Sequence, residues 1–330
     1  MMRRLLLPLA LISAAPAPVA VVPSPSEIVA AAPAKDWVAI APSDLLVMDL
    51  AADAKGKPRR VVIQLMPAPF SQGWIGNIRA LANAHWWDGT SINRVQDNYV
   101  VQWGDVTEKK PLPPGLASVG ESEYSAPSST AEGFRFHQWE LWSGSQMWGG
   151  APPPSPIFDP APAFRSEIHG YTDNFYRGFA FTSALSPHSA QVFPIHCYGM
   201  VGVGRNLPPD TGSGAELYTV IGQAPRHLDR NIALVGRVIE GIENLSSLPR
   251  GTGALGFYEN AEERVPIVSV RLANALPADK PFPRYEYLST ESPSFAKYAD
   301  ARANRRDPFF IKAAGGADIC NIPVPVRRAP

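Results

Sequence analysis

The segment GTSINRVQDNYVVQWGD, residues 89–105, places one arginine, Arg94, in a run of strand-forming and small polar residues. Val95, Tyr99 and Val100 favour strands that pack on one face, so we expect Arg94 to reach a surface that these residues also line. Arginine stays charged at any working pH and presents a rigid fork of N–H donors. Arg94 is therefore either an ordinary solvated strand residue or a fixed cation beside an apolar wall.

The motifs for dinucleotide binding, serine hydrolysis and metal binding are each incomplete in this sequence. GMVGVGR has the glycine order G-x-x-G-x-G, and no helical pattern follows it to present an N-terminus to a phosphate. Ser213 in TGSGAE lacks the flanking glycines of a nucleophile elbow, because Thr211 and Ala215 occupy those places. The histidines have no i, i+4 pair that suggests a metal site; they are His85, His137, His169, His188, His196 and His227. We predict no metal site.

The composition is that of a globular protein without a strong electrostatic field. The 330 residues are 45% hydrophobic, which is enough to fill a core. Lysine plus arginine equals aspartate plus glutamate at 30 each, so the formal net charge is zero. We therefore expect no nucleic acid partner. Proline is frequent, with 35 residues, which indicates long irregular connections around a compact centre.

The first twenty residues have the three parts of a secretory signal peptide in order. Arg3 and Arg4 precede an apolar run from Leu5 to Ile12, and small residues suited to cleavage follow. A disordered apolar terminus is the alternative. Residues 21–38 are expected to be a Pro/Ala-rich linker. No other stretch reaches the ~18 apolar residues of a membrane helix, so we predict an exported protein without a membrane span, periplasmic in a Gram-negative cell.

The chain has two cysteines, Cys197 and Cys320. An even count in an oxidising compartment permits one disulfide that closes a long loop. Their spacing fits no zinc motif. The alternative is two separately buried thiols, because the sequence does not give the distance between them.

Short strands and one clear helix are expected to position Arg94. The runs Asp44–Leu50 and Arg59–Pro67 flank the turn-rich segment ADAKGKP and read as a hairpin. Strands are also expected at Ile92–Val95 and Tyr99–Trp103. Between hairpin and strands, apolar residues recur at three- and four-residue spacing, which is typical of an amphipathic helix; they are Trp74, Ile75, Ile78, Leu81 and Ala82.

The second half of the chain alternates irregular and regular segments. Residues 106–163 are rich in Pro, Gly and Ser, and we expect them to be an insertion whose Trp139, Trp142 and Trp148 pack it onto the domain. Ligand binding by these tryptophans is the alternative. Strand patterns follow in FRSEIHG, GFAFTSAL, YGMVGVGR, AELYTVIG and ALVGRVIEG, and a short helix in EGIENLSSLPRG. We predict a mainly β fold, a closed antiparallel barrel capped by two helices, over residues 39–275. Residues 276–330 should be an extension that wraps this domain.

The order of these elements and their residues resembles the cyclophilin family of peptidyl-prolyl isomerases. PFSQGWIGNIRAL looks like the family helix P-x-T-x-x-N-F-x-x-L, with Asn77 in the asparagine place. INRVQDNYVVQWGD is similar to F-H-R-V-I-P-x-F-M-x-Q-G-G-D, and it matches at Arg94 and Gln102 among other positions. GSGAELYT resembles G-S-Q-F-F-I-x-T, and HLDRNIALVGRVIEG resembles W-L-D-x-x-x-x-V-F-G-x-V-x-x-G. The resemblance covers about 44–105 and 199–248.

The resemblance implies a site and also shows where this chain departs from the family. Arg94, Gln102, Tyr99, Val100 and Leu228 keep the family's character and would be catalytic or line the substrate pocket. Three further substrate-binding positions are changed, since the family has glutamine, phenylalanine and often tryptophan where this chain has Gly214, Glu216 and His227.

The activity implied is isomerisation of the peptide bond before proline, in flexible or unfolded exported proteins, with no cofactor. Arg94 would stabilise the twisted prolyl amide, and Gln102 would orient the backbone carbonyl. A cyclophilin-like module that binds Pro-containing segments or a protein partner without turning them over is the alternative. Glu216 at the pocket floor favours that alternative, as does the Trp-rich insertion.

Overall fold

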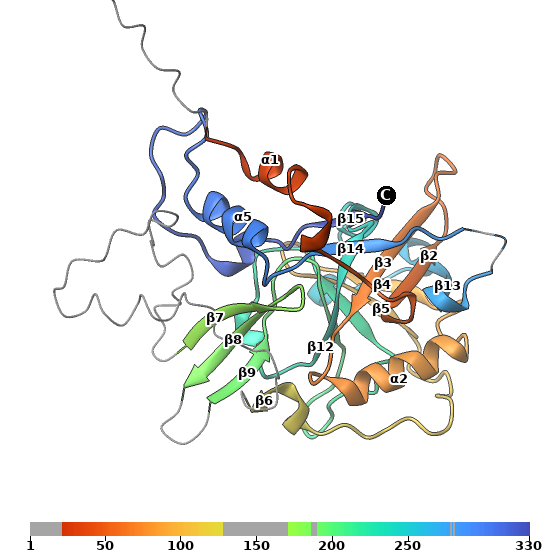
Figure 1. The fold of residues 1–330 in the computed structure, drawn as a ribbon. Helices are drawn as coiled ribbons and strands as arrows, with labels where there is room; N and C mark the ends of the chain where they lie inside the picture. The colour runs from red at the N-terminus through yellow and green to blue at the C-terminus, as the bar shows by residue number, and fades with distance from the viewer. Residues whose placement is uncertain (1–21, 128–170, 186–189, 278, 280) are drawn as a thin grey trace, which may run out of the picture.

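A computed structural model describes residues 22–127, 171–185, 190–277, 279 and 281–330 (Figure 1). The predicted signal peptide, residues 1–20, lies outside the described residues. So does most of the predicted insertion, with Trp139, Trp142 and Trp148, and so does the strand candidate FRSEIHG. In the described residues no helix is both long and apolar enough to cross a membrane.

The centre of the molecule is a closed antiparallel barrel, as the strand patterns predict. Its strand order is β10-β11-β5-β4-β13-β2-β3-β12. The predicted hairpin is β2 paired with β3, and the two strands around Arg94 are β4 paired with β5. The bounds are β2 Leu45–Leu50, β3 Arg59–Leu65, β4 Ser91–Val95, β5 Val100–Gly104, β10 Met200–Val203, β11 Leu217–Val220, β12 Leu234–Glu240 and β13 Val265–Leu272.

Alternation along the strands sends apolar side chains into the barrel. Ile92, Trp103 and Leu217 lie on neighbouring strands and are almost completely buried. Helix α2, Gln72–Asn83, packs its apolar stripe on the barrel, and Trp74, Ile78 and the other residues of the predicted stripe are buried. The second predicted helix is a single turn, α4, Glu243–Ser246.

A second sheet follows β5 in the chain and does not join the barrel (Figure 1). Its strand order is β6-β9-β8-β7. The insertion, predicted to end near residue 163, therefore continues to Pro194. GFAFTSAL forms β8 of this sheet and is no barrel strand, because β8 pairs with β7 and β9. The bounds are β6 Ala126–Pro127, β7 Tyr171–Tyr176, β8 Phe179–Leu185 and β9 Ala190–Pro194.

The two ends of the described chain meet in a third sheet, ordered β1-β14-β15. The expectation of a linker over residues 21–38 is wrong, because these residues contain α1 and most of β1. Ser24 and Glu27 form a capping box, with Pro25 at the first helical position, and α1 lies against α5 (Figure 1). The bounds are α1 Pro25–Ala30, β1 Trp37–Ala39, β14 Tyr285–Leu288, α5 Pro293–Ala303 and β15 Val326–Arg328.

Short 3₁₀ turns and one disulfide complete the connections. Cys197, after β9, is bonded to Cys320 in the C-terminal extension, with an S–S distance of 1.98 Å. The bridge therefore joins the end of the insertion sheet to the extension. The turns are η1 Ala34–Asp36, η2 Pro42–Asp44, η3 Glu121–Tyr124, η5 Arg226–Leu228, η6 Ala254–Gly256, η7 Ala261–Glu263, η8 Ala273–Ala275 and η9 Ile319–Asn321.

Candidate functional site

Arg94 reaches the outer face of the barrel because β4 contains a bulge. Ile92 pairs with Trp103 and Arg94 pairs with Gln102, so Asn93 is an extra residue without a cross-strand partner on β5. On a regular strand residues 92 and 94 would share a face, and Arg94 would point into the core with Ile92. The extra residue reverses the alternation. Arg94 and Gln102 consequently lie side by side on the outside of the barrel.

Three acceptors hold the Arg94 guanidinium, one at each nitrogen. Nε donates to the backbone carbonyl of Leu255 at 2.8 Å, and one terminal nitrogen donates to Gln102 Oε1 at 3.2 Å. The other terminal nitrogen donates to Gln96 Oε1. A guanidinium has five N–H groups. These bonds use three, so within the described part of the chain one N–H on each terminal nitrogen remains for a substrate.

Two aromatic rings flank the same guanidinium. Arg94 Cζ lies 5.7 Å from the centroid of the Tyr99 ring and 5.3 Å from that of Phe257. The Tyr99 ring also stacks on the ring of His227, with centroids 6.2 Å apart and an interplanar angle of 9°. Burial lowers the pKa of Arg94 from its ordinary value. Arginine remains charged despite such a shift.

An apolar cluster adjoins Arg94 and is separate from the main core. Val100, Tyr218 and Val220 are buried and contact one another, and Tyr99 and Ile232 pack on them. Val100 and Val220 are cross-strand partners on β5 and β11, and Tyr218 is the partner of Gln102. These side chains therefore share the outer face with Gln102. They supply the apolar wall beside the cation.

Gly214 lies against helix α2. Its φ is +93°, in the left-handed region, and a Cβ built on it would lie 3.3 Å from Ile78 Cγ1 and 3.7 Å from the Trp74 carbonyl oxygen. A side chain at this position would point toward the helix. Gly214 thus offers no side chain to the candidate site, although the resemblance gives this position to a substrate-binding glutamine.

Glu216 lies two residues before Tyr218 on the outer face of the barrel. Its carboxylate lies over Gly104 and occupies the space that a Cβ on that glycine would take. The same oxygen accepts the backbone N–H of Asp105 at 2.7 Å. Desolvation raises the pKa of Glu216 to about 7. The position that the resemblance gives to the pocket floor is therefore occupied by a partly buried carboxyl group.

The predicted site residues divide into two groups in the structure. Hydrogen bonds, ring contacts and packing join one group, which consists of Arg94, Gln102, Tyr99, Val100 and His227. His227 is exposed on η5, and Leu228 is half-buried on the same turn. Glu216 lies further along the outer face, and Gly214 belongs to the α2 side.

Three contacts of Arg94 could not be predicted from the sequence. Leu255 and Phe257 come from the loop after α4, more than 160 residues along the chain. No local pattern relates such distant residues. Gln96, two residues from Arg94, carries no signal beyond its polarity. In the part of the chain that the structure describes, no cluster of three or more His, Cys, Asp or Glu could hold a metal ion.

Comparisons with known proteins identify the family of this chain. The family model described as cyclophilin type peptidyl-prolyl cis-trans isomerase/CLD matches residues 57–272. Among solved structures, the cyclophilin AquaCyp293 from Hirschia baltica is similar, with TM-score 0.61, 19% identity, and coverage of 89% of this chain and 94% of that one. No curated protein matches the chain.

Another match is a cyclophilin-type isomerase from Cryptosporidium parvum, solved in the presence of the dipeptide Ala-Pro. It gives TM-score 0.35 and 11% identity, and covers 68% of this chain and 98% of its own. The family model spans well over half of the 330 residues. The chain therefore belongs to the cyclophilin-type peptidyl-prolyl cis-trans isomerase family, whose reaction is isomerisation of the peptide bond before proline.

Proposed function

We propose that this isomerase works by electrostatic stabilisation of the twisted prolyl amide, with Arg94 as the donor. The peptide bond resists rotation by about 18–20 kcal/mol because of its partial double-bond character. Twisting removes the resonance and leaves a lone pair on the prolyl nitrogen. A donor aimed at that lone pair stabilises the transition state more than the planar ground state, which is the condition for catalysis.

The fixed guanidinium is the observation that carries this proposal. Its orientation is set by Leu255 O, Gln102 and Gln96 before any substrate arrives. Preorganised donors need no rearrangement during the reaction, which is why they are effective. The remaining N–H on each terminal nitrogen supports the role of donor to the prolyl nitrogen.

Gln102 and the apolar cluster have separate tasks in this mechanism. Gln102 uses Oε1 to accept from Arg94, so its amide NH₂ is available to hold a substrate carbonyl. Tyr99, which is partly exposed, offers an apolar surface to the pyrrolidine ring, and the buried Val100 packs behind it. No covalent step is needed, because isomerisation breaks no bond.

We further propose that the substrates are Pro-containing segments of exported proteins. The support is the order of charge, apolar run and small residues in the first twenty residues. Slow prolyl isomerisation, which takes tens to hundreds of seconds uncatalysed, would limit the folding of such proteins. Mass spectrometry of the protein from its native cell tests export, and an intact Met1 in a cytoplasmic fraction would overturn it.

A protease-coupled assay on an X-Pro peptide tests the mechanism. Arg94→Ala should slow the catalysed rate about a hundred- to thousandfold, the usual effect of losing one transition-state donor. Arg94→Lys should recover little, because lysine keeps the charge and loses the fork. The matched control is Arg60→Ala, which removes an arginine paired with Asp49 elsewhere on the barrel.

Three results would speak against the mechanism. An unchanged rate in Arg94→Ala would remove the arginine from the reaction. Unfolding of that variant, seen as a large fall in melting temperature, would make Arg94 a structural residue. Peptide binding by the wild-type protein without any acceleration would favour the binding module, which the partly buried carboxyl of Glu216 also favours.

A further inference from the structure

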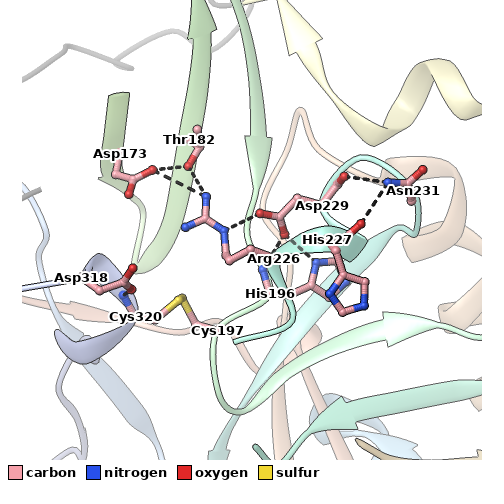
Figure 2. Close-up of polar contacts among 10 residues, drawn as sticks. All are labelled: Asp173, Thr182, His196, Cys197, Arg226, His227, Asp229, Asn231, Asp318 and Cys320. Atoms are coloured by element: carbon pink, nitrogen blue, oxygen red, sulfur yellow. Dashed lines mark hydrogen bonds and ion pairs between the residues drawn. A yellow bond between two sulfur atoms is a disulfide. The ribbon is translucent and has the colours of Figure 1, made fainter. Parts of the chain in front are cut away.

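Behind the apolar cluster, a chain of buried hydrogen bonds joins separate parts of the fold. The Tyr218 hydroxyl lies 2.7 Å from His196 Nε2, and His196 Nδ1 lies 2.8 Å from Asp229 Oδ1. His196 is 1% exposed and Asp229 8%. Figure 2 shows this pair near the Cys197–Cys320 disulfide. The mechanism proposed above uses none of these polar groups.

Burial fixes the direction of each bond in this chain. Desolvation lowers the pKa of His196, so its ring is neutral at neutral pH. A neutral ring has one N–H, and because the Asp229 carboxylate only accepts, that proton lies on Nδ1. Nε2 then accepts the O–H of Tyr218, whose pKa burial raises well above its ordinary value. Each group therefore has a defined donor or acceptor role.

Asp229 joins this chain to the turn that carries two of the predicted pocket residues. Its carboxylate accepts the backbone N–H of His196 at 2.9 Å and the Nε–H of Arg226 at 2.5 Å, in addition to the histidine ring. Arg226 is the first residue of η5, and Asp229 directly follows its last residue, Leu228. Charge-assisted bonds of this kind are roughly twice as strong as neutral ones. They hold η5 at both ends.

Arg226 also ties η5 to the insertion sheet. Its terminal nitrogen donates to Thr182 Oγ1 at 3.0 Å, and the Thr182 hydroxyl donates to Asp173. Thr182 lies in β8 and Asp173 in β7. As Figure 2 shows, Arg226 reaches from the turn toward these two strands while Asp229 faces His196. The turn is thus fixed against two different parts of the fold.

Both ends of this chain of bonds reach residues of the candidate site. Tyr218 is the cross-strand partner of Gln102 and contacts Val100. At the other end, η5 presents His227, whose ring stacks on Tyr99. None of the three acceptors that hold Arg94 belongs to the chain. A change at Asp229 should therefore move the pocket wall and leave the guanidinium in place.

We propose that Asp229 is a positioning residue of the isomerase, which fixes η5 so that His227 and Leu228 complete the wall that receives the proline ring. This inference rests on the proposed function, because it assigns η5 to the substrate-binding side of Arg94 and Tyr99. The wall contacts the ring in the planar and the twisted states alike. Its displacement weakens both states equally, which raises KM and leaves kcat nearly unchanged.

Asp229→Asn is the variant that tests the proposal, because it keeps the shape of the side chain and replaces one acceptor oxygen by an NH₂ group. We expect KM for an X-Pro peptide to rise about tenfold, the effect of losing one charge-assisted hydrogen bond. We expect kcat to stay within about twofold. The NMR signal of the His196 Nδ1 proton should shift or vanish, which reports the bond itself.

The matched control is Asp88→Asn, which breaks a two-bond pair with Arg271 outside this chain of bonds. It should leave KM unchanged. If Asp229→Asn does not fold, Tyr218→Phe replaces it, since that variant removes only one O–H; a rise of about threefold in KM is then expected.

The outcomes separate this inference from the proposed function. An unchanged KM with a lower melting temperature would show that Asp229 only stabilises the fold. A fall in kcat as large as that of Arg94→Ala would show that the chain of bonds acts on the twisting step, and would also overturn the proposal. If the wild-type protein proves inactive, the proposed function fails, and an NMR titration with the same peptide still tests Asp229, since its Kd should rise about tenfold.

Discussion

Two arginines on the outside of the barrel have nearly the same surroundings and different exposure. Arg94 on β4 is the cross-strand partner of Gln102, and Arg237 on β12 is the cross-strand partner of Gln64. Each donates to its glutamine and to a backbone carbonyl, that of Leu255 or that of Val324. Each lies between two aromatic rings, Tyr99 and Phe257 or Phe179 and Tyr287.

What lies over each arginine makes the difference. The insertion sheet and β14 cover Arg237, which is 9% exposed, and one of its terminal nitrogens has no hydrogen-bond partner in the described residues. Burial lowers its pKa to about 10. Arg94 is only half-buried, and one N–H on each of its terminal nitrogens has no acceptor among the described residues. The immediate neighbours of an arginine thus do not decide whether its side chain is accessible or buried. The segments that lie over the side chain decide it.

Removing the disulfide should affect the covered side of the molecule most. The Cys197→Ser/Cys320→Ser double variant loses a bridge over 123 residues of sequence separation. We expect the free energy of unfolding to fall by about 4 kcal/mol, since the bridge restricts the unfolded chain. Denaturant unfolding measures this loss. Hydrogen exchange should rise in β14 and β15 more than in β4 and β5, and wild-type protein in reductant should behave in the same way. An equal rise in exchange in these two pairs of strands would contradict the distinction between the covered side at Arg237 and the open side at Arg94.

Shortening Arg237 should destabilise the fold without slowing catalysis. Arg237→Ala leaves a cavity between two rings and an unpaired Gln64, and we expect a loss of about 3 kcal/mol in the free energy of unfolding. Arg237→Met keeps most of the volume and removes a buried charge, so its stability should lie within about 1 kcal/mol of the wild type. Thermal melts and the isomerase assay check both variants. A slower rate in Arg237→Met would break the distinction between the two arginines.

The sequence could predict the barrel because its signals are local. Alternation identifies the β2–β3 hairpin, and the three- and four-residue spacing identifies α2. The capping box of α1 was also present, as Ser24 and Glu27, but the Pro/Ala composition around it concealed the helix. Local signals are sufficient for elements whose stability comes from their own residues and their nearest strand.

The site could be predicted only in part, because its remaining contacts are not local. Arg94 and Gln102 are eight residues apart on paired strands, and a pattern can join them. Leu255 is 161 residues from Arg94, and the direction of Arg94 depends on the bulge at Asn93. A one-residue change in register is invisible in a composition of strand formers. For the same reason the sequence does not distinguish Arg237 from Arg94.

Glu216 is partly buried, as Arg94 is, and its titration measures how far burial removes the carboxyl group from water. Its folded-state pKa of about 7 lies above the ordinary 4.5. Between these pH values the folded protein therefore holds a proton that the unfolded chain releases. Stability from this group is complete below pH 4.5 and is lost as the pH rises through 7. We expect the wild type to lose about 2 kcal/mol more than Glu216→Gln between roughly pH 5 and 7.5. Parallel curves in denaturant unfolding would show that the carboxyl is solvated.

The smallest effect should come from Phe257, one of the two rings beside Arg94. Phe257 is 39% exposed, and a cation–π contact at such a site is worth about 0.5–1 kcal/mol. Phe257→Ala should therefore slow the isomerase about two- to fivefold. The bonds from Arg94 to Leu255 O and Gln102 remain and keep the guanidinium in place. Phe257→Leu retains apolar cover without the π face, so a rate equal to that of Phe257→Ala would assign the effect to the ring's charge distribution. A hundredfold loss in both variants would instead mean that Phe257 contacts the substrate. Arg94 would then depend on the residues that cover it as much as Arg237 does.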